Sequence, residues 1–184
     1  ALKFEIIQRT AGLARVGKIE TQHGVIETPA FIVAGTKAAV KALTVNDVEN
    51  LGGQAILANT YHLLLQPGID LIAAAGGLAK FMSWHKPTFT DSGGFQIFSL
   101  GQAFDQGLKN TVVAANKSCK NNVKISDEGV LFRSHINGDL LEMTPEISMI
   151  AQHKIGADIH MAFDQLVSPS SSPTEIKTTL ERTH

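Results

Sequence analysis

The stretch TPEISMIAQHKIGADIHMAFD, residues 144–164, decides the fold because it holds a helix, a stop and a buried strand in immediate succession. Thr144 is placed as a helix N-cap, Pro145 occupies the first helical position, and Gly156 marks the end of the helix. The apolar run DIHMAF then predicts a buried strand that ends at Asp164. A helix followed by a buried strand is the unit from which parallel sheets with crossover helices are built.

The same order occurs twice earlier in the chain. Residues 44–60 place Thr44 as an N-cap and Gly52 as a stop, and the apolar run AILANT follows. The segment PGIDLIAAAGGLAKFM, residues 67–82, has the apolar spacing of a helix, and the β-prone PTFT comes after it. The sequence therefore predicts an α/β fold with a parallel sheet.

The first forty residues have a different pattern of apolar and polar positions. ARVGKIETQHGVIETPAFIVAG, residues 14–35, alternates apolar and polar positions, which is typical of short strands. His23 and Gly24 form a plausible hairpin turn between KIET and VIETPAF. We expect an N-terminal segment of antiparallel strands.

A second antiparallel segment is expected at about 102–143, as an insertion between the third and fourth strands of the parallel sheet. Its centre is rich in Lys and Asn, and short β-prone runs follow, with the hairpin signal Asn137-Gly138 between two of them. The lysines could contact a polyanion or belong to a solvated loop; they are Lys109, Lys117, Lys120 and Lys124. The role of residues 102–124 stays open.

Composition excludes several classes of protein. The net charge is −1, with 16 Lys and Arg against 17 Asp and Glu, so the overall charge gives no sign of nucleic-acid binding. The single cysteine, Cys119, excludes a small disulfide scaffold and leaves no Cys pair for a zinc site in this chain. No apolar run reaches the ~20 residues of a membrane helix, and the N-terminus does not resemble a signal peptide. We expect a cytoplasmic protein with no membrane association.

Polar residues stand where three predicted strands end. They are Asn59-Thr60, Asp91-Ser92 and Asp164-Gln165. In open α/β sheets and in (β/α)8 barrels, ligands bind at the carboxyl ends of the strands. Asp91-Ser92-Gly93-Gly94 also supplies a charged acceptor, a hydroxyl and two positions without Cβ, which is more than an ordinary turn requires. These residues form the candidate site.

Five long motifs, taken together, resemble the tRNA-guanine transglycosylases, also called queuine tRNA-ribosyltransferases. They are GTKAAVKALT (35–44), ILANTYHLLLQPG (56–68), TDSGGFQIFSL (90–100), DEGVLFRSHINGD (127–139) and residues 144–164. The resemblance runs from about Gly17 to the end of the chain and keeps the motif order of the family. Several long motifs in the same order rarely arise by chance.

The resemblance implies a (β/α)8 TIM-barrel enzyme that exchanges the guanine at the wobble position of certain tRNAs for a 7-deazaguanine base. The exchange passes through a covalent ribosyl-enzyme intermediate and leaves the phosphodiester backbone intact. By the resemblance, Asp91 is the catalytic proton acceptor and Asp164 binds the guanine-like base. An ionised carboxylate only accepts hydrogen bonds, so Asp164 suits the adjacent N–H donors of a guanine edge. Gly93 and Gly94 let the backbone approach a flat ring, which Ser92 would adjoin and Phe95 would contact.

Other features of the family lie further along its sequence than this chain extends. By the resemblance, residues 1–184 are therefore the amino-terminal half of a single barrel domain, with roughly four of the eight barrel strands. The nucleophilic aspartate, the zinc subdomain and its Cys/His ligands are in that later part. We therefore expect no metal ligands here, zinc in the full-length protein, a homodimer of that protein, and no activity from this part alone. Phe95 replaces a Tyr of some members, and Gln165-Leu166 replaces a frequent Glu-Cys, so the incoming base, the aminomethyl precursor or queuine, stays open.

Two other hypotheses remain. A glycoside hydrolase also uses two carboxylates at barrel strand ends, but it would normally show aromatic residues for sugar stacking, and this chain has one Trp and one Tyr. Alternatively, the chain is a non-catalytic half that pairs with a partner subunit.

Overall fold

The computed structural model describes residues 2–99 and 123–184. The chain divides into two compact units, which are described separately below. The first unit contains Ala1–Asp91 and Ile150–Met161, and the second contains Ser92–Met149 and Ala162–His184. The boundary between them falls inside the candidate motif, between Asp91 and Ser92.

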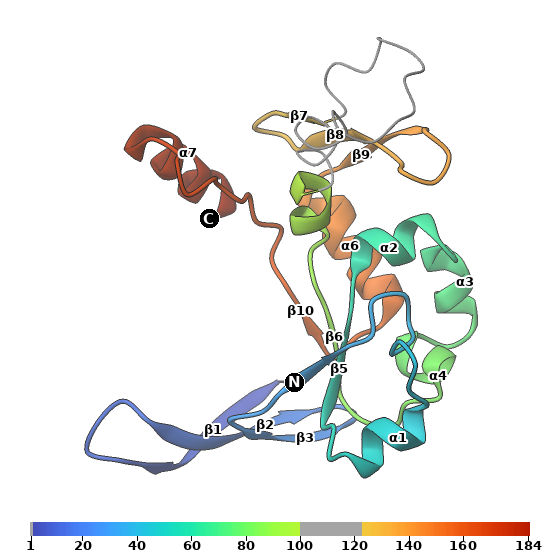
Figure 1. Cartoon of the computed structure of the whole chain (residues 1–184), viewed down its shortest axis with the longest axis vertical. Helices are drawn as coiled ribbons and strands as arrows, with labels where there is room; N and C mark the ends of the chain where they lie inside the picture. The colour runs from blue at the N-terminus through green and yellow to red at the C-terminus, as the bar shows by residue number, and fades with distance from the viewer. Residues whose placement is uncertain (1, 100–122) are drawn as a thin grey trace. The chain divides into compact units, whose positions relative to one another are not determined.

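An antiparallel sheet opens the first unit, as the alternating pattern predicted. It consists of β1 (Lys3–Arg9), β2 (Arg15–Thr21) and β3 (Gly24–Thr28), in that order (Figure 1). The predicted turn was wrong by one residue, because Gln22 and His23 connect the strands. Gly24 already pairs with Thr21 as part of β3, at a φ of 134° that L side chains rarely adopt.

Four parallel strands form the second sheet of this unit. They are β4 (Ile32–Ala34), β5 (Ala55–Ala58), β6 (Thr88–Thr90) and β10 (Ile159–His160), in the order β10-β6-β5-β4. The prediction of a parallel sheet with an excursion between its third and fourth strands is confirmed. The described strands form an open sheet and do not close a barrel. The last strand is shorter than predicted, so Asp164 lies beyond its end rather than at it.

Short helices connect these strands. They are α1 (Val45–Asn50), α2 (Thr60–Leu65), α3 (Ile69–Ala74), α4 (Leu78–Met82) and α6 (Pro145–Ile155). The predicted cap at Thr44 is confirmed, because its hydroxyl and the carboxylate of Asp47 make a reciprocal capping box. The expectation of one helix over residues 67–82 was wrong. Gly76 and Gly77 both have a φ of 93°, which no helix accommodates, and they separate α3 from α4.

Two hydrophobic clusters lie on opposite faces of the parallel sheet, because successive side chains of β5 alternate. Ile56 and Ala58 pack with the helices in one cluster, which also contains the fully buried Trp84. Ala55 and Phe89 pack with Ile26 of β3 in the other. The second cluster therefore joins the antiparallel sheet to the parallel one. Helices α1–α4 lie along the same side of the sheet in Figure 1.

The second unit contains the predicted antiparallel insertion. Its sheet consists of β7 (Val123–Ile125), β8 (Val130–Arg133) and β9 (Leu140–Met143), and α7 spans Pro173–Thr183. Asn137-Gly138 lies between β8 and β9 as predicted, but within the longer loop 134–139 rather than as a two-residue turn. Residues 102–122 of the predicted insertion, with Cys119 and three of the four lysines singled out there, lie outside the described residues.

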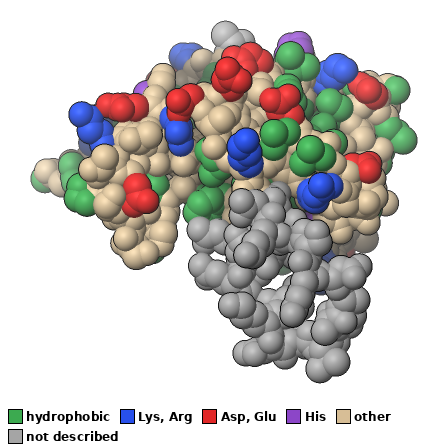
Figure 2. All heavy atoms as spheres, turned by 90° about the horizontal axis from the view of Figure 1, so that it is seen from above, with side chains coloured by type: hydrophobic (Ala, Val, Ile, Leu, Met, Phe, Trp, Pro, Cys, Tyr) green, Lys and Arg blue, Asp and Glu red, His purple; other side chains and the backbone are tan. Residues whose placement is uncertain are grey.

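Acidic and basic side chains are interspersed on the face drawn in Figure 2. Within the described ranges, no helix is long and apolar enough to cross a membrane.

Candidate functional site

Asp91 stands immediately after β6, in the first unit, and both of its carboxylate oxygens are engaged. The side-chain amide of Asn59 donates a hydrogen bond to Oδ2, and the backbone N–H of Thr60 donates to Oδ1 at 2.9 Å. The hydroxyl of Thr60 also donates to the backbone carbonyl of Asp91. These contacts fix both the backbone and the carboxylate of a half-buried acid.

The position of Asn59 explains why it contacts Asp91. Asn59 is the N-cap of α2, yet its side chain makes no cap hydrogen bond to its own helix. Parallel strands β5 and β6 are neighbours, so the residue that follows β5 lies beside the residue that follows β6. The prediction that polar residues meet at these two strand ends is confirmed for Asn59, Thr60 and Asp91.

A buried glutamine that the sequence analysis did not single out stabilises the same strand end. Gln152 of α6 accepts a hydrogen bond from the Thr90 hydroxyl at 3.0 Å. It also accepts from the N–H of Met161 at 3.0 Å and donates to its carbonyl at 2.9 Å. Gln152 is fully buried. The only sequence signal for it was a polar residue on the apolar face of a helix.

In the second unit, Ser92 connects the glycine pair to Asp164. Its hydroxyl donates to Oδ1 of Asp164 at 3.1 Å and accepts the N–H of Gly94 at 3.2 Å. Its backbone carbonyl accepts a hydrogen bond from the hydroxyl of Ser148 at 2.7 Å. Ser92 is buried, and its contacts hold the half-buried Asp164 carboxylate and the backbone turn at Gly94.

Gly94 lies where no side chain fits. A Cβ built there would come within 2.6 Å of the Asp164 carbonyl oxygen. Gly93 has a φ of 85°, a backbone conformation that favours glycine. Glycine is thus required at 93 by the backbone conformation and at 94 by the lack of space for a Cβ. A helical segment starts at Gly94, and the ring of Phe95 in its first turn is 58% exposed.

A cavity of about 70 Å³ lies beside Asp164 within this unit. Its lining is mostly apolar and includes Ile97, Phe98 and Val130, while Asp164, Asp127 and Arg182 supply charged groups. Convergent polar groups in an apolar setting are typical of small-molecule sites.

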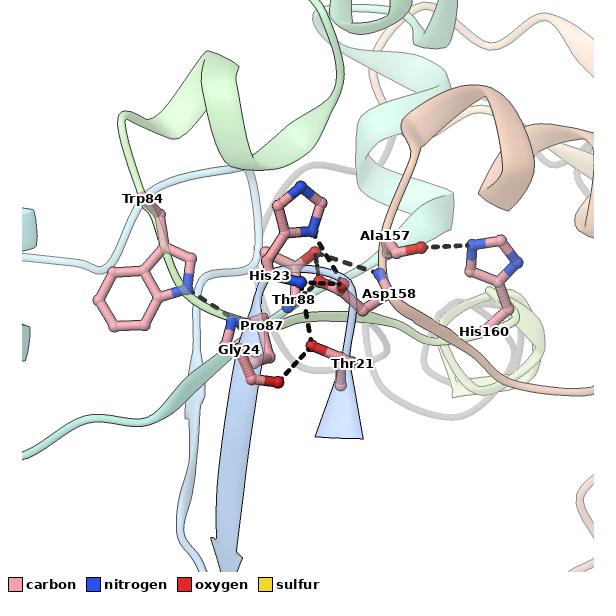
Figure 3. Close-up of polar contacts among 9 residues, drawn as sticks. All are labelled: Thr21, His23, Gly24, Trp84, Pro87, Thr88, Ala157, Asp158 and His160. Atoms are coloured by element: carbon pink, nitrogen blue, oxygen red, sulfur yellow. Dashed lines mark hydrogen bonds and ion pairs between the residues drawn. The ribbon is translucent and has the colours of Figure 1, made fainter. Parts of the chain in front are cut away.

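Another buried carboxylate, Asp158, serves the fold rather than the candidate site. It precedes β10 and accepts hydrogen bonds from the backbone N–H of Thr88 at 2.9 Å and of His23 at 3.2 Å (Figure 3). The ring Nδ1 of His23 lies 2.8 Å from the same carboxylate. Burial raises the pKa of Asp158, but the hydrogen bonds from Thr88 and His23 outweigh it, so the pKa lies below its usual value. Asp158 thus ties the β2–β3 turn to the start of β6.

Comparisons with known proteins show which family the chain resembles. The family model of queuine tRNA-ribosyltransferase matches residues 10–184. A queuine tRNA-ribosyltransferase of Moorella thermoacetica is 45% identical over 184 residues, which is 100% of this chain and 44% of the relative. Those of Protochlamydia amoebophila and Thermus thermophilus are 45% and 44% identical, over 99% and 98% of this chain and 47% and 42% of their own lengths.

The chain thus spans less than half the length of these relatives, and what it matches includes the whole candidate motif. By its sequence and by the family model that covers nearly all of it, the chain belongs to the queuine tRNA-ribosyltransferase family.

Proposed function

We propose that the whole protein exchanges the guanine at the wobble position of tRNA for a 7-deazaguanine base. The observation that carries this proposal is the carboxylate of Asp91, held by Asn59 and Thr60 at a strand end in a chain of this family. The alternative of a glycoside hydrolase is disfavoured, because family membership points to base exchange rather than hydrolysis.

Asp91 is proposed to accept a proton. When the new glycosidic bond forms between the incoming base and the ribose, the ring nitrogen that attacks the anomeric carbon must lose its hydrogen. A carboxylate held in a fixed position accepts that proton without a reorganisation cost at the moment of reaction. The nucleophile that forms the covalent ribosyl intermediate would come from the part of the family's sequence that follows the stretch matched by this chain.

Asp164 is proposed to recognise the base. The Ser92 hydroxyl is a neutral donor that bonds to one carboxylate oxygen of Asp164 and holds this carboxylate in place. The Asp164 carboxylate only accepts hydrogen bonds, so it matches the ring N–H and the exocyclic amino group of guanine. Adenine presents an acceptor at the corresponding ring position. The exposed ring of Phe95 supports a role in contacting a flat base.

The remaining expectations also belong to the whole protein. They are a closed (β/α)8 barrel, a homodimer, a cytoplasmic location and the identity of the incoming base. Among the described residues, no three His, Cys, Asp or Glu side chains group as a metal site.

Incorporation of labelled guanine into tRNA by the whole protein tests the proposal. We expect exchange by the unsubstituted protein and none detectable for Asp91→Ala or Asp91→Asn, with tRNA binding nearly unchanged. Asp139→Asn, on the exposed loop between β8 and β9, is the matched control and should exchange normally. Exchange by the Asp91 variants would refute the assigned role, and absence of exchange by the unsubstituted protein would refute the function.

A further inference from the structure

We propose that Arg182 and Thr183, in the last turn of α7, are positioning residues that hold Asp164 for base binding through its neighbour Gln165. This inference rests on the proposed function of Asp164. All of the residues involved belong to the second unit.

The segment that carries Asp164 needs support from elsewhere. Strand β10 ends at His160, and residues 161–172 form neither helix nor strand. The Asp164 side chain is held by Ser92, but that contact does not fix the backbone that follows it. A side chain on an irregular segment keeps its direction only if the backbone is restrained by other parts of the fold.

Thr183 restrains the backbone directly. Its Oγ1 accepts the backbone N–H of Gln165 at 3.2 Å. The same hydroxyl donates its hydrogen to the carbonyl of Thr179 at 3.0 Å, one helical turn earlier. Because that hydrogen is directed into the helix, the oxygen presents a lone pair to Gln165. The hydroxyl is therefore oriented as an acceptor for the residue next to Asp164.

Arg182 restrains the Gln165 side chain. Its Nη1 donates to Oε1 of Gln165 at 3.1 Å. Its Nε and Nη2 lie 2.7 and 2.6 Å from Oδ1 of Asp127, in the turn between β7 and β8. The guanidinium thus joins three segments of the chain: α7, the segment after β10 and the β7–β8 turn. A planar fork makes such simultaneous contacts, and a lysine ammonium does not reproduce them.

The test separates positioning from general stability. Thr183→Val removes the acceptor while keeping the shape of the side chain, and Thr183→Ser keeps the hydroxyl. Arg182→Lys keeps the charge but not the fork. Thr178→Val is the matched control, because Thr178 is exposed on the same helix. Each variant of the whole protein is examined for guanine Kd, tRNA Kd, kcat and KM for guanine in base exchange, and melting temperature.

For Thr183→Val and Arg182→Lys we expect guanine Kd and KM to rise about fivefold, the effect of losing one ordinary hydrogen bond. The kcat and tRNA Kd should change less than about twofold, since neither bonds to the reacting groups. Thr183→Ser and Thr178→Val should match the unsubstituted protein. Hydrogen exchange at the Gln165 amide should quicken in Thr183→Val, which reports the lost contact independently of activity.

Each other outcome overturns the inference. If Thr183→Val leaves guanine Kd unchanged although the unsubstituted protein binds guanine, α7 does not position Asp164, and the proposed function stands. If melting temperature, tRNA Kd and guanine Kd all worsen together, or Thr183→Ser fails to restore affinity, the residues support the fold only. If the unsubstituted protein does not bind guanine, the proposed function fails and this inference falls with it.

Discussion

Asn59 and Asp91, which stand 32 positions apart, meet through a hydrogen bond from the Asn59 amide to Oδ2 of the Asp91 carboxylate. The next residue, Thr60, occupies the other oxygen through its backbone N–H. The two residues that follow β5 thereby hold both carboxylate oxygens of the acid that follows the neighbouring strand β6. The contact assigns Asn59 a role through Asp91 rather than through the base.

Asn59→Ala should lower kcat for base exchange about tenfold, because a hydrogen bond to a charged group is worth about 1.5–3 kcal/mol and its loss leaves the Asp91 carboxylate less firmly held. The tRNA Kd should not change. Steady-state exchange kinetics with labelled guanine measure this, and Asn46→Ala on the exposed side of α1 is the control. A kcat equal to that of the unsubstituted protein would show that Asp91 keeps its orientation without Asn59.

Asp164→Asn should weaken guanine binding by at least about tenfold, since one acceptor becomes a donor that faces a donor of the base. Ser92→Ala should have a smaller effect, because it removes one neutral hydrogen bond to Oδ1 and leaves the charge. Equilibrium binding of labelled guanine measures the guanine affinity of each of the two variants. Unchanged affinity in Asp164→Asn contradicts the recognition of the guanine edge.

The sequence predicted the parts of this fold that depend on local chemistry. The caps at Thr44 and Thr144, and the order of strands and helices, follow from residue types that act within one turn. Asp91 and Asn59 were singled out as candidate site residues because they follow apolar runs. Pattern alone was sufficient here because each strand end is marked by a change from apolar to polar residues.

Such local patterns could not predict contacts between distant segments. The amide of Gln152 bonds to Thr90 and Met161, and nothing local to the helix indicates that partner. Asp158 looked like part of a strand, but it accepts bonds from a turn far earlier in the chain. The split at Gly76 and Gly77 was missed because apolar spacing continues across both glycines.

Gly94→Ala should reduce guanine affinity and destabilise the protein by about 1–3 kcal/mol, because the new Cβ would come within 2.6 Å of the Asp164 carbonyl and must displace that segment. Gly138→Ala is the control. It also faces a cost, about 1–2 kcal/mol, because its φ is 79°, but its Cβ would meet nothing within 4 Å. Chemical denaturation and guanine binding together test this. If both variants bind guanine alike, the close approach at Gly94 has no part in the site.

The buried carboxylate of Asp158 should make stability depend on pH in acid. Its pKa is lowered below the usual 3.8, so the folded state binds its proton less readily than the unfolded state. The stabilisation is therefore fully present above about pH 4 and is lost as pH falls through the lower, folded-state pKa. Asp158→Asn should lower the free energy of unfolding by about 2–4 kcal/mol near pH 6, because an amide hydrogen then faces the N–H of Thr88.

Urea denaturation of the unsubstituted protein and of Asp158→Asn, at about pH 6 and about pH 3, measures that difference. The gap in unfolding free energy between the two proteins should shrink in acid, because only the unsubstituted protein loses a charged acceptor there. Asp70→Asn is the matched control: the Asp70 carboxylate pairs with Lys154 but is 83% exposed, so its loss should cost at most about 1 kcal/mol. A gap between the unsubstituted protein and Asp158→Asn that stays constant from pH 6 to pH 3 would mean that the Asp158 pKa is the same in the folded and unfolded states. The contacts of Asp158 with Thr88 and His23 would then act through shape rather than through charge.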